Sequence, residues 1–486
     1  MILIAVVILY FALLFAISRW TGRRASNETF YRADRRSPWF MVAFGMVGAS
    51  ISGVTFVSVP GMVMNAQMTY LQTCMGFVLG YVAVAFLLLP LYYRLNLTSI
   101  YAYLGQRLGR RSHTTGSAFF LISKLAGASL RFYVVCMILQ RFVFDAAGVP
   151  FMVTVVVLVM LIWLYTRRGG IKTLVWTDSL QTACLFTALL LIIYKVVADL
   201  GMSPGEAMAA VREHELSRVF VMDDWVSKQN FWKQFVSGVF IVVVMTGLDQ
   251  DMMQKNLTCK SLRSAQKDMC TYGMAFLPAN LLFLALGVLL VMWYRQQGMT
   301  LPAGDELLPN YIAEASAQAK TAAGSSWLAL QASFLEIVFV LGIVAASFSS
   351  ADSALTSLTT IFCVDILKQS ENEQARKRVH LMMCLLFVVF ILVFKAVNST
   401  SLIDAVYTIV SYTYGPLLGL FAFGLLTRRS VSDRWTPYIA VAAPLLCFAI
   451  DYGVGRWLDY RFGYELLMLN GMLTFAGLWL TGGRRL

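Results

Sequence analysis

Charged residues are scarce in this chain. Lys, Arg, Asp and Glu together make up 13% of the 486 residues, whereas 59% are hydrophobic. Soluble domains carry roughly twice that share of charge. A soluble protein of this composition could not cover its surface with polar groups, so the composition excludes an ordinary soluble fold.

Metal-ligating and disulfide patterns are also missing. The chain has eight cysteines, most of them inside apolar runs, and no two are spaced as CxxC. The spacing therefore indicates neither a zinc site nor a disulfide framework. The chain has only three histidines, and none lies inside an apolar run, so a histidine proton relay is not indicated.

Long apolar blocks are abundant instead, such as Ile2–Ser18, Leu180–Val197 and Leu277–Trp293. About 20 mostly apolar residues in a helix cross the hydrocarbon core of a bilayer. Lipid offers backbone groups no hydrogen-bond partners, and the alternating strands of a membrane barrel are absent. The sequence therefore predicts an all-α polytopic membrane protein.

Counting the apolar blocks gives about thirteen transmembrane helices. We expect them near residues 2–18, 38–64, 71–93, 115–146, 150–166, 173–200, 231–252, 268–296, 327–367, 379–397, 401–427, 435–454 and 462–481. The chain is predicted to form a single transmembrane transporter domain over residues 1–486.

The basic residues behind the net charge of +13 are spread over alternate loops of the chain and do not form one cluster. Basic residues gather in alternate short loops, and the intervening loop at 202–228 is acidic. This is the positive-inside pattern, so the expected partner of the basic residues is a lipid bilayer and not nucleic acid. It predicts a plasma (inner) membrane protein with its N-terminus outside and its C-terminus cytoplasmic. The first apolar run precedes its basic residues, the reverse of a signal peptide, so we expect it to be retained.

Two of the expected helices are rich in small and hydroxyl residues. The second contains Gly48–Gly53 and then Pro60-Gly61, and the ninth contains Ala345–Ser353. One interpretation is close packing of helix backbones. The other is a broken helix whose freed carbonyls, together with hydroxyls, coordinate a cation.

Among the ionisable residues inside the predicted spans we single out Asp178, Asp352 and Arg131. Each such charge costs about 2.5–3.5 kcal/mol at a helix centre on insertion scales, so it is expected to face a cavity or a partner. Ser349 and Ser353 share a helix face, and Asp352 adds a carboxylate one turn from Ser349. Hard cations prefer such all-oxygen surroundings, which indicates sodium. The alternative for Arg131 is a structural ion pair with one of the acids.

Five motifs give the chain a resemblance to the sodium:solute symporter family from about residue 1 to 481. They are Gly48–Phe56, the Gly169-Gly170 pair with Trp176–Gln181, Gly247–Leu257, Ser349–Asp365 and Tyr414–Gly419. The resemblance implies a leucine-transporter-type fold with inverted five-helix repeats at about 38–200 and 231–427. One extra helix (1–18) would precede them and two (435–481) would follow. It also implies a transporter and not an enzyme.

The resemblance further implies the sodium ligands. Carbonyls of the broken helix and oxygens of the ninth helix would hold the ion, and an aspartate near them binds a second sodium in some members. Asp352 replaces the Ser or Thr expected in the family. The sodium residues expected on this basis are Gly48, Ile51, Ala346, Ser349, Ser350, Asp178, Asp352 and Ser353.

The substrate pocket is also expected by resemblance. Arg131 resembles the arginine with which bacterial sodium–sialic acid symporters bind a carboxylate, and Ser52, Thr55 and Gln72 match polar pocket positions. The acid, Asn and Tyr of the family's sugar carriers are missing from 70–91 and 235–247. The leading substrate is therefore a small organic anion such as sialic acid. The alternatives are a monocarboxylate, an amino acid, a sugar, an inorganic anion, a non-transporting solute sensor and an ion channel.

Overall fold

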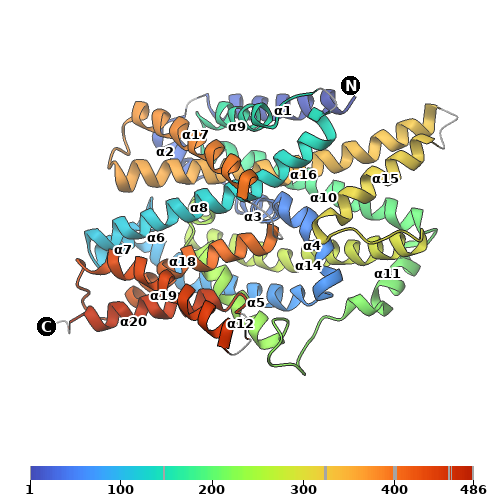
Figure 1. Ribbon diagram of the computed structural model, residues 1–486. Coiled ribbons are helices and arrows are strands. Elements are labelled where there is room, and N and C mark those ends of the chain that lie inside the picture. Colours follow the sequence, from blue (N-terminus) through green and yellow to red (C-terminus); the bar gives the residue numbers. More distant parts are fainter. Residues whose placement is uncertain are drawn as a thin grey trace.

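The structure is a computed structural model that describes residues 2–23, 25–145, 148–321, 326–397, 402–457, 460 and 462–483. The described residues are almost entirely helical, and among them the only β feature is an isolated bridge between Ser37 and Cys259. Most of the long helices run roughly parallel to one another (Figure 1). The prediction of an all-α fold is confirmed.

Twenty α-helices follow one another along the described chain, and seven short π-helical or 3-10 elements lie next to their ends. Their bounds are α1 Ile2–Thr21, α2 Asn27–Arg32, α3 Trp39–Ser50, α4 Gly53–Ala66, α5 Tyr70–Ala83, α6 Leu89–Arg94, α7 Ala102–Arg107, α8 Arg110–Leu139, α9 Phe151–Thr166, α10 Ile171–Asp199, α11 Pro204–Glu213, α12 Phe231–Val242, α13 Gln250–Asn256, α14 Leu262–Gln296, α15 Leu307–Thr321, α16 Ser326–Ile361, α17 Glu373–Val397, α18 Leu402–Leu426, α19 Thr436–Trp457 and α20 Leu466–Thr481.

Many of these helices are long and apolar enough to cross a membrane. Eight described helices meet that condition, or up to ten when two bent helix pairs are each taken as one span. Three shorter apolar helices, α1, α9 and α20, accompany them. The multi-pass architecture is therefore confirmed, whereas the number of thirteen spans stays a prediction.

Both bent pairs are breaks inside an expected span. α3 and α4 meet at an angle of 60°, and α12 with its terminal π-turn meets α13 at 69°. At the first break Ile51 leaves helical geometry, with φ −82° and ψ 86°. At the second, Asp249 is extended and its side chain caps α13. The expected division into repeats at 38–200 and 231–427 stays a prediction, and each break lies in the first helix of one expected repeat.

The ninth expected helix is not broken. α16 is continuous over Ser326–Ile361 and ends in a π-helical turn, Phe362–Ile366. The interpretation of its Ala345–Ser353 stretch as a break is therefore wrong. These residues are buried, and α16 packs against α8 and α10. Small side chains let neighbouring backbones approach, so the packing interpretation holds here.

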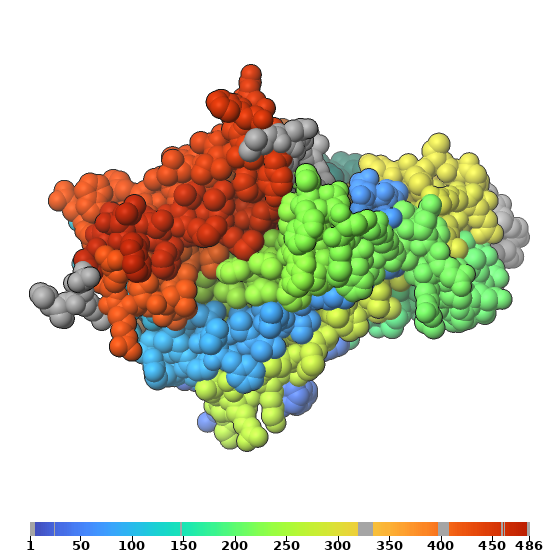
Figure 2. All heavy atoms as spheres, turned by 90° about the horizontal axis from the view of Figure 1, so that it is seen from below, coloured from blue at the N-terminus to red at the C-terminus, as the bar shows by residue number. Residues whose placement is uncertain are grey.

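The centre and the periphery of the molecule differ in composition. In the most apolar window of α16, 78% of residues are buried, against 17% in α19. The face seen in Figure 2 is formed partly by the C-terminal helices, drawn in red. On α19, Leu445, Leu446 and Phe448 are exposed by 54% or more. Large exposed aliphatic and aromatic side chains on a peripheral helix are what a surface facing lipid requires.

The segments that connect the long helices lie at two opposite ends of the molecule. α11 and α15, two helices that the sequence analysis did not expect, lie at one end in Figure 1, and α7 and the chain's C-terminal region lie at the other. The first end contains the acidic 202–228 segment, and the second contains the basic loop before α8. The cavity described next lies between these ends.

Candidate functional site

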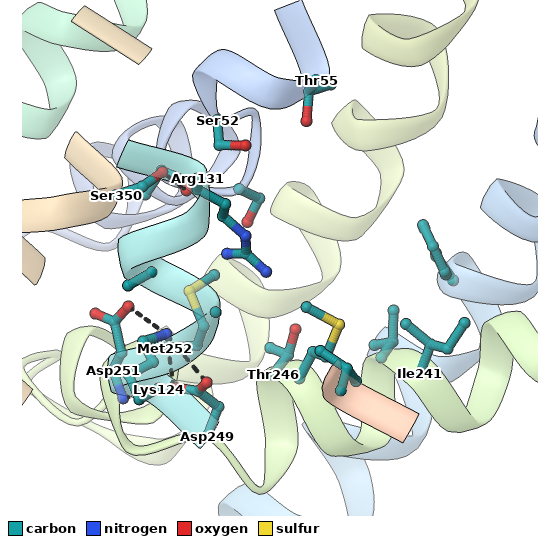
Figure 3. Close-up of a pocket in the computed structure, with 18 of the residues that line it drawn as sticks. Ser52, Thr55, Lys124, Arg131, Ile241, Thr246, Asp249, Asp251, Met252 and Ser350 are labelled. Atoms are coloured by element: carbon teal, nitrogen blue, oxygen red, sulfur yellow. Dashed lines mark hydrogen bonds and ion pairs between the residues drawn. The ribbon is translucent and has the colours of Figure 1, made fainter. Parts of the chain in front are cut away.

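A cavity opens where the two helix breaks face α5, α8, α14 and α18. About 1060 Å³ of space lies between the lining atoms, part of it open to solvent. Three of the four expected substrate residues, Ser52, Thr55 and Arg131, line it (Figure 3). The structure thus brings together residues from α3–α4 and from α8 that lie about eighty positions apart in the chain.

Arg131 is the prominent cation of this cavity. It projects from α8, and Figure 3 shows its guanidinium group below Ser52. Its side chain is partly exposed, and no hydrogen bond or ion pair joins it to another described residue. Tyr414 lies close enough to interact with it electrostatically. An unpaired guanidinium at membrane depth is costly, so its position favours a negatively charged ligand.

The structural ion pair that was the alternative for Arg131 is not formed. Asp178 pairs with Lys255 at 2.7 Å, and Asp352 accepts a hydrogen bond from the Tyr165 hydroxyl at 2.7 Å. Both carboxylates are therefore engaged elsewhere.

Gln72, the fourth expected substrate residue, does not line this cavity. Its amide nitrogen donates to the carbonyls of Thr69 and Gln229, and its oxygen accepts from the backbone N–H of Val221. The side chain is fully buried. The structure thus gives Gln72 the role of attaching the 221–229 segment to α5.

The end of α3 contacts α16 through a hydroxyl group. Ser350 Oγ donates to the carbonyl of Ala49 at 2.8 Å and to that of Ala346 at 3.3 Å. The last carbonyls of a helix lack intrahelical partners, so the break exposes the carbonyls of Gly48 to Ile51. Gly48 also lets α3 approach α10, because a Cβ atom there would lie 2.8 Å from that of Thr182. The expected sodium ligands of α3 and α16 therefore lie side by side.

The expected acids lie on the far side of this contact. Ser349 Oγ donates to Asp178 Oδ1 at 2.7 Å, and the carboxylates of Asp178 and Asp352 interact electrostatically. Asp352 Oδ1 and Ser353 Oγ are buried and have no hydrogen-bond partner among the described residues. These unsatisfied oxygens fit a small cation, because buried polar atoms are ordinarily paired.

Sequence reasoning missed a second charged cluster, which lies on the cavity wall. Lys124 of α8 pairs with Asp249 at 3.0 Å and with Asp251 at 2.7 Å, as Figure 3 shows, and the Tyr414 hydroxyl donates to Asp249 at 2.6 Å. Lys255 was missed as well. All four charged residues lie inside or beside predicted spans, so the insertion cost that singled out Arg131 could also have found them.

Comparison with known proteins identifies the family of this chain. The model of the sodium:solute symporter family matches residues 30–433. A sodium/sialic acid symporter of Aliivibrio fischeri is 26% identical over 443 residues, covering 87% of this chain and 82% of the relative. One from Proteus mirabilis is 23% identical over 432 residues, covering 85% and 82%.

A solved structure shows the same fold. The substrate-bound, outward-open state of a sodium-coupled sialic acid symporter aligns with a TM-score of 0.80 at 20% identity, covering 99% of this chain and 97% of that one. The leucine-transporter-type architecture is thereby confirmed. Because the family match spans most of the chain, this protein belongs to the sodium:solute symporter family and is a sodium-coupled transporter, not an enzyme.

Proposed function

We propose that this protein couples sodium entry to the uptake of a small organic anion bearing a carboxylate, with sialic acid as the leading example. The observation that carries the proposal is Arg131, a guanidinium exposed in the cavity without a protein partner. Its planar fork matches a carboxylate and binds it through two parallel hydrogen bonds. Ser52 and Thr55, which line the same cavity, would bind further polar groups of the solute.

Sodium would bind at the contact between the end of α3 and α16. The proposed ligands are the carbonyl oxygens of Gly48, Ile51 and Ala346 and the hydroxyls of Ser349 and Ser350. An all-oxygen set of this kind suits a hard cation. In the structure the Ser350 hydroxyl donates to Ala49, and a sodium ion would replace that hydrogen bond as the link between the two helices.

A second sodium would bind at Asp178, Asp352 and Ser353. Support comes from the unpaired oxygens of Asp352 and Ser353 and from the Ser349 hydroxyl, which lies between Asp178 and the first proposed site. Asp178 is shared with Lys255, so Asp352 is the acid with the free oxygen.

The break between α3 and α4 connects the two functions. Gly48 and Ile51 lie on one side of the break, and Ser52 and Thr55 lie on the other. Sodium binding would fix the position of the break and hence of the residues that meet the solute. A ligand that stabilises one arrangement of a shared element raises the affinity of a second ligand that needs the same arrangement.

The expected orientation supports uptake. The basic loops would face the cytoplasm across the plasma (inner) membrane, with the N-terminus outside and the C-terminus inside. Labelling of single cysteines placed in the α11 and α15 segments by a membrane-impermeant reagent in intact cells would test this topology. Protection of both segments would contradict it.

The function is tested in proteoliposomes with labelled sialic acid and a panel of other carboxylates. We expect counterflow that requires sodium and that falls in Arg131→Lys, which keeps the charge but loses the fork. A charge-assisted hydrogen bond contributes roughly 1.5–3 kcal/mol, so solute affinity should fall by about 10- to 100-fold while sodium binding persists. Full affinity in a stable Arg131→Lys protein would contradict the proposal, and binding without counterflow would identify a sensor.

A further inference from the structure

A second part of the cavity wall carries negatively charged residues, in contrast to the positive charge of Arg131. Asp249 and Asp251, next to the second helix break, share the single ammonium of Lys124. Both acids line the same cavity as Arg131. Lys124 brings one positive charge to these two carboxylates, and Lys255 of the same helix as Asp251 also interacts electrostatically with Asp251. A buried charge is costly unless a ligand or a neighbour supplies the partner.

Of the two carboxylates, Asp251 and not Asp249 has an oxygen that accepts no hydrogen bond. Asp249 Oδ1 accepts from the backbone N–H of Asp251 at 2.8 Å, and Oδ2 accepts from Tyr414 and Lys124. Asp251 Oδ2 contacts Lys124, whereas its Oδ1 has no hydrogen-bond partner among the described residues. Asp251 lines the cavity and is only 5% exposed, and Oδ1 itself has almost no contact with solvent. A solute would therefore reach this oxygen after the Asp251 side chain turns towards the cavity.

The other residues that line the cavity indicate which kind of solute group would contact this oxygen. Tyr70, Phe77, Tyr81, Tyr272 and Phe276 give the cavity an aromatic side. Aromatic faces cover apolar parts of a solute and also attract cations such as an ammonium group. They do not replace the hydrogen-bond donor that the free carboxylate oxygen lacks.

We propose that Asp251 is a specificity-determining residue, whose free oxygen accepts a hydrogen bond from an N–H or O–H group at the end of the solute opposite its carboxylate. This rests on the proposed function, because Arg131 must hold the carboxylate end. The preferred solute is then dipolar or rich in donors, and a plain fatty acid of the same length is a poor substrate.

The proposal is tested with carboxylates that differ only at their far end. Unsubstituted fatty acids, ω-hydroxy acids and ω-amino acids of matched and increasing chain length are titrated, in saturating sodium, against the purified full-length protein by isothermal calorimetry, with sialic acid alongside. At the best chain length we expect a donor-bearing acid to bind about tenfold or more tightly than the unsubstituted acid. A preference for the amino acid over the hydroxy acid would identify a cationic donor, and the reverse a neutral one.

Asp251→Asn should lower this ratio several-fold, because the amide oxygen still accepts a hydrogen bond but loses the charge that strengthens it. Lys124 keeps Asp249 as its partner in that variant, so the fold should survive. The matched control is Asp223→Asn in the exposed 201–230 segment, which should keep the ratio. Should Asp251→Asn fail to fold, Asp251→Glu retains the charge and should shift the preferred chain length towards shorter solutes.

Two results would overturn the proposal. One is a wild-type protein that binds the three classes equally at every length. The other is an unchanged ratio in a folded Asp251→Asn protein, or an unchanged length preference in Asp251→Glu. If fatty acids still bind with sodium and depend on Arg131, only the role of Asp251 is lost. If no carboxylate binds at all, the proposed function is lost with it.

Discussion

Lys255 and Arg131 are both cations inside the membrane domain, yet their surroundings differ. The Lys255 side chain is 2% exposed and lies 2.7 Å from Asp178, whereas Arg131 opens into the cavity without a protein partner. A buried charge with a partner mainly maintains the fold, because its loss strands the opposite charge. A partly exposed charge without a protein partner does not hold the fold together and remains available to a ligand.

The largest effect that follows from this contrast concerns Lys255→Met. Removing one member of a buried ion pair typically lowers stability by about 3–5 kcal/mol. We expect the melting temperature in detergent to fall sharply, and Asp178→Asn in the same protein to restore part of the loss, since the stranded charge is then gone. Arg131→Met is the matched control and should melt close to the wild type. Similar losses in the two single variants would remove the distinction drawn above.

Asp352→Ser should change sodium coupling without changing the choice of solute. The variant restores the hydroxyl expected in the family and removes the carboxylate whose Oδ1 has no described partner. We expect the ratio of sodium to solute, measured with both labels in one proteoliposome preparation, to change by about one ion per solute, because a carboxylate is the stronger cation ligand. A shift in solute preference at a constant ratio would place Asp352 on the solute side instead.

Ser350→Ala should have a moderate effect. The hydroxyl is one neutral ligand among several, and a neutral hydrogen bond contributes about 1 kcal/mol. The sodium concentration for half-maximal uptake should therefore rise by about fivefold, with solute affinity at saturating sodium nearly unchanged. Ser357→Ala, a hydroxyl on the same helix that donates to its own helix backbone, is the control. Unaltered sodium dependence in a folded Ser350→Ala protein would exclude this hydroxyl as a ligand.

The smallest effect is expected at an exposed ion pair. Arg295 and Glu215 lie 2.8 Å apart, but their side chains are 52% and 65% exposed. Exposed pairs contribute about 0–1 kcal/mol, so Arg295→Gln should hardly change the melting temperature. A loss as large as that of Lys255→Met would show that burial is not what separates the two classes of charge.

The sequence predicted the fold because the signals for membrane helices are strong and local. Apolar blocks of sufficient length, together with the alternating basic loops, gave the helical spans within a few residues. A break was one of two interpretations for both Gly48–Gly53 and Ala345–Ser353, and the structure has a break at the first stretch and none at the second. The break between α12 and α13 was not expected. Small residues allow either a break or close packing, and only the three-dimensional neighbours of α16 decide between them.

Only part of the candidate site was predicted, because contacts between distant helices decide which polar residues face the cavity. Ser52, Thr55 and Arg131 do meet in one cavity, and Ser349 does contact Asp178. Gln72 was misplaced because a polar residue at a helix start can turn either to the cavity or to a loop. Lys124 and Lys255 were overlooked because a residue's partner on a distant helix leaves no local pattern in the chain.

Helix α13 contains only seven residues, and it contacts both the cavity and the proposed sodium-binding region. Asp251 and Lys255 are four positions apart and so lie on one face of the helix. Asp251 lines the cavity, and Lys255 is paired with Asp178. A segment this short moves as a unit. If Asp178 binds sodium as proposed, a tilt of α13 that frees Asp178 from Lys255 would also displace Asp251. We then expect a change in sodium occupancy to shift the affinity for the solute, and the reverse.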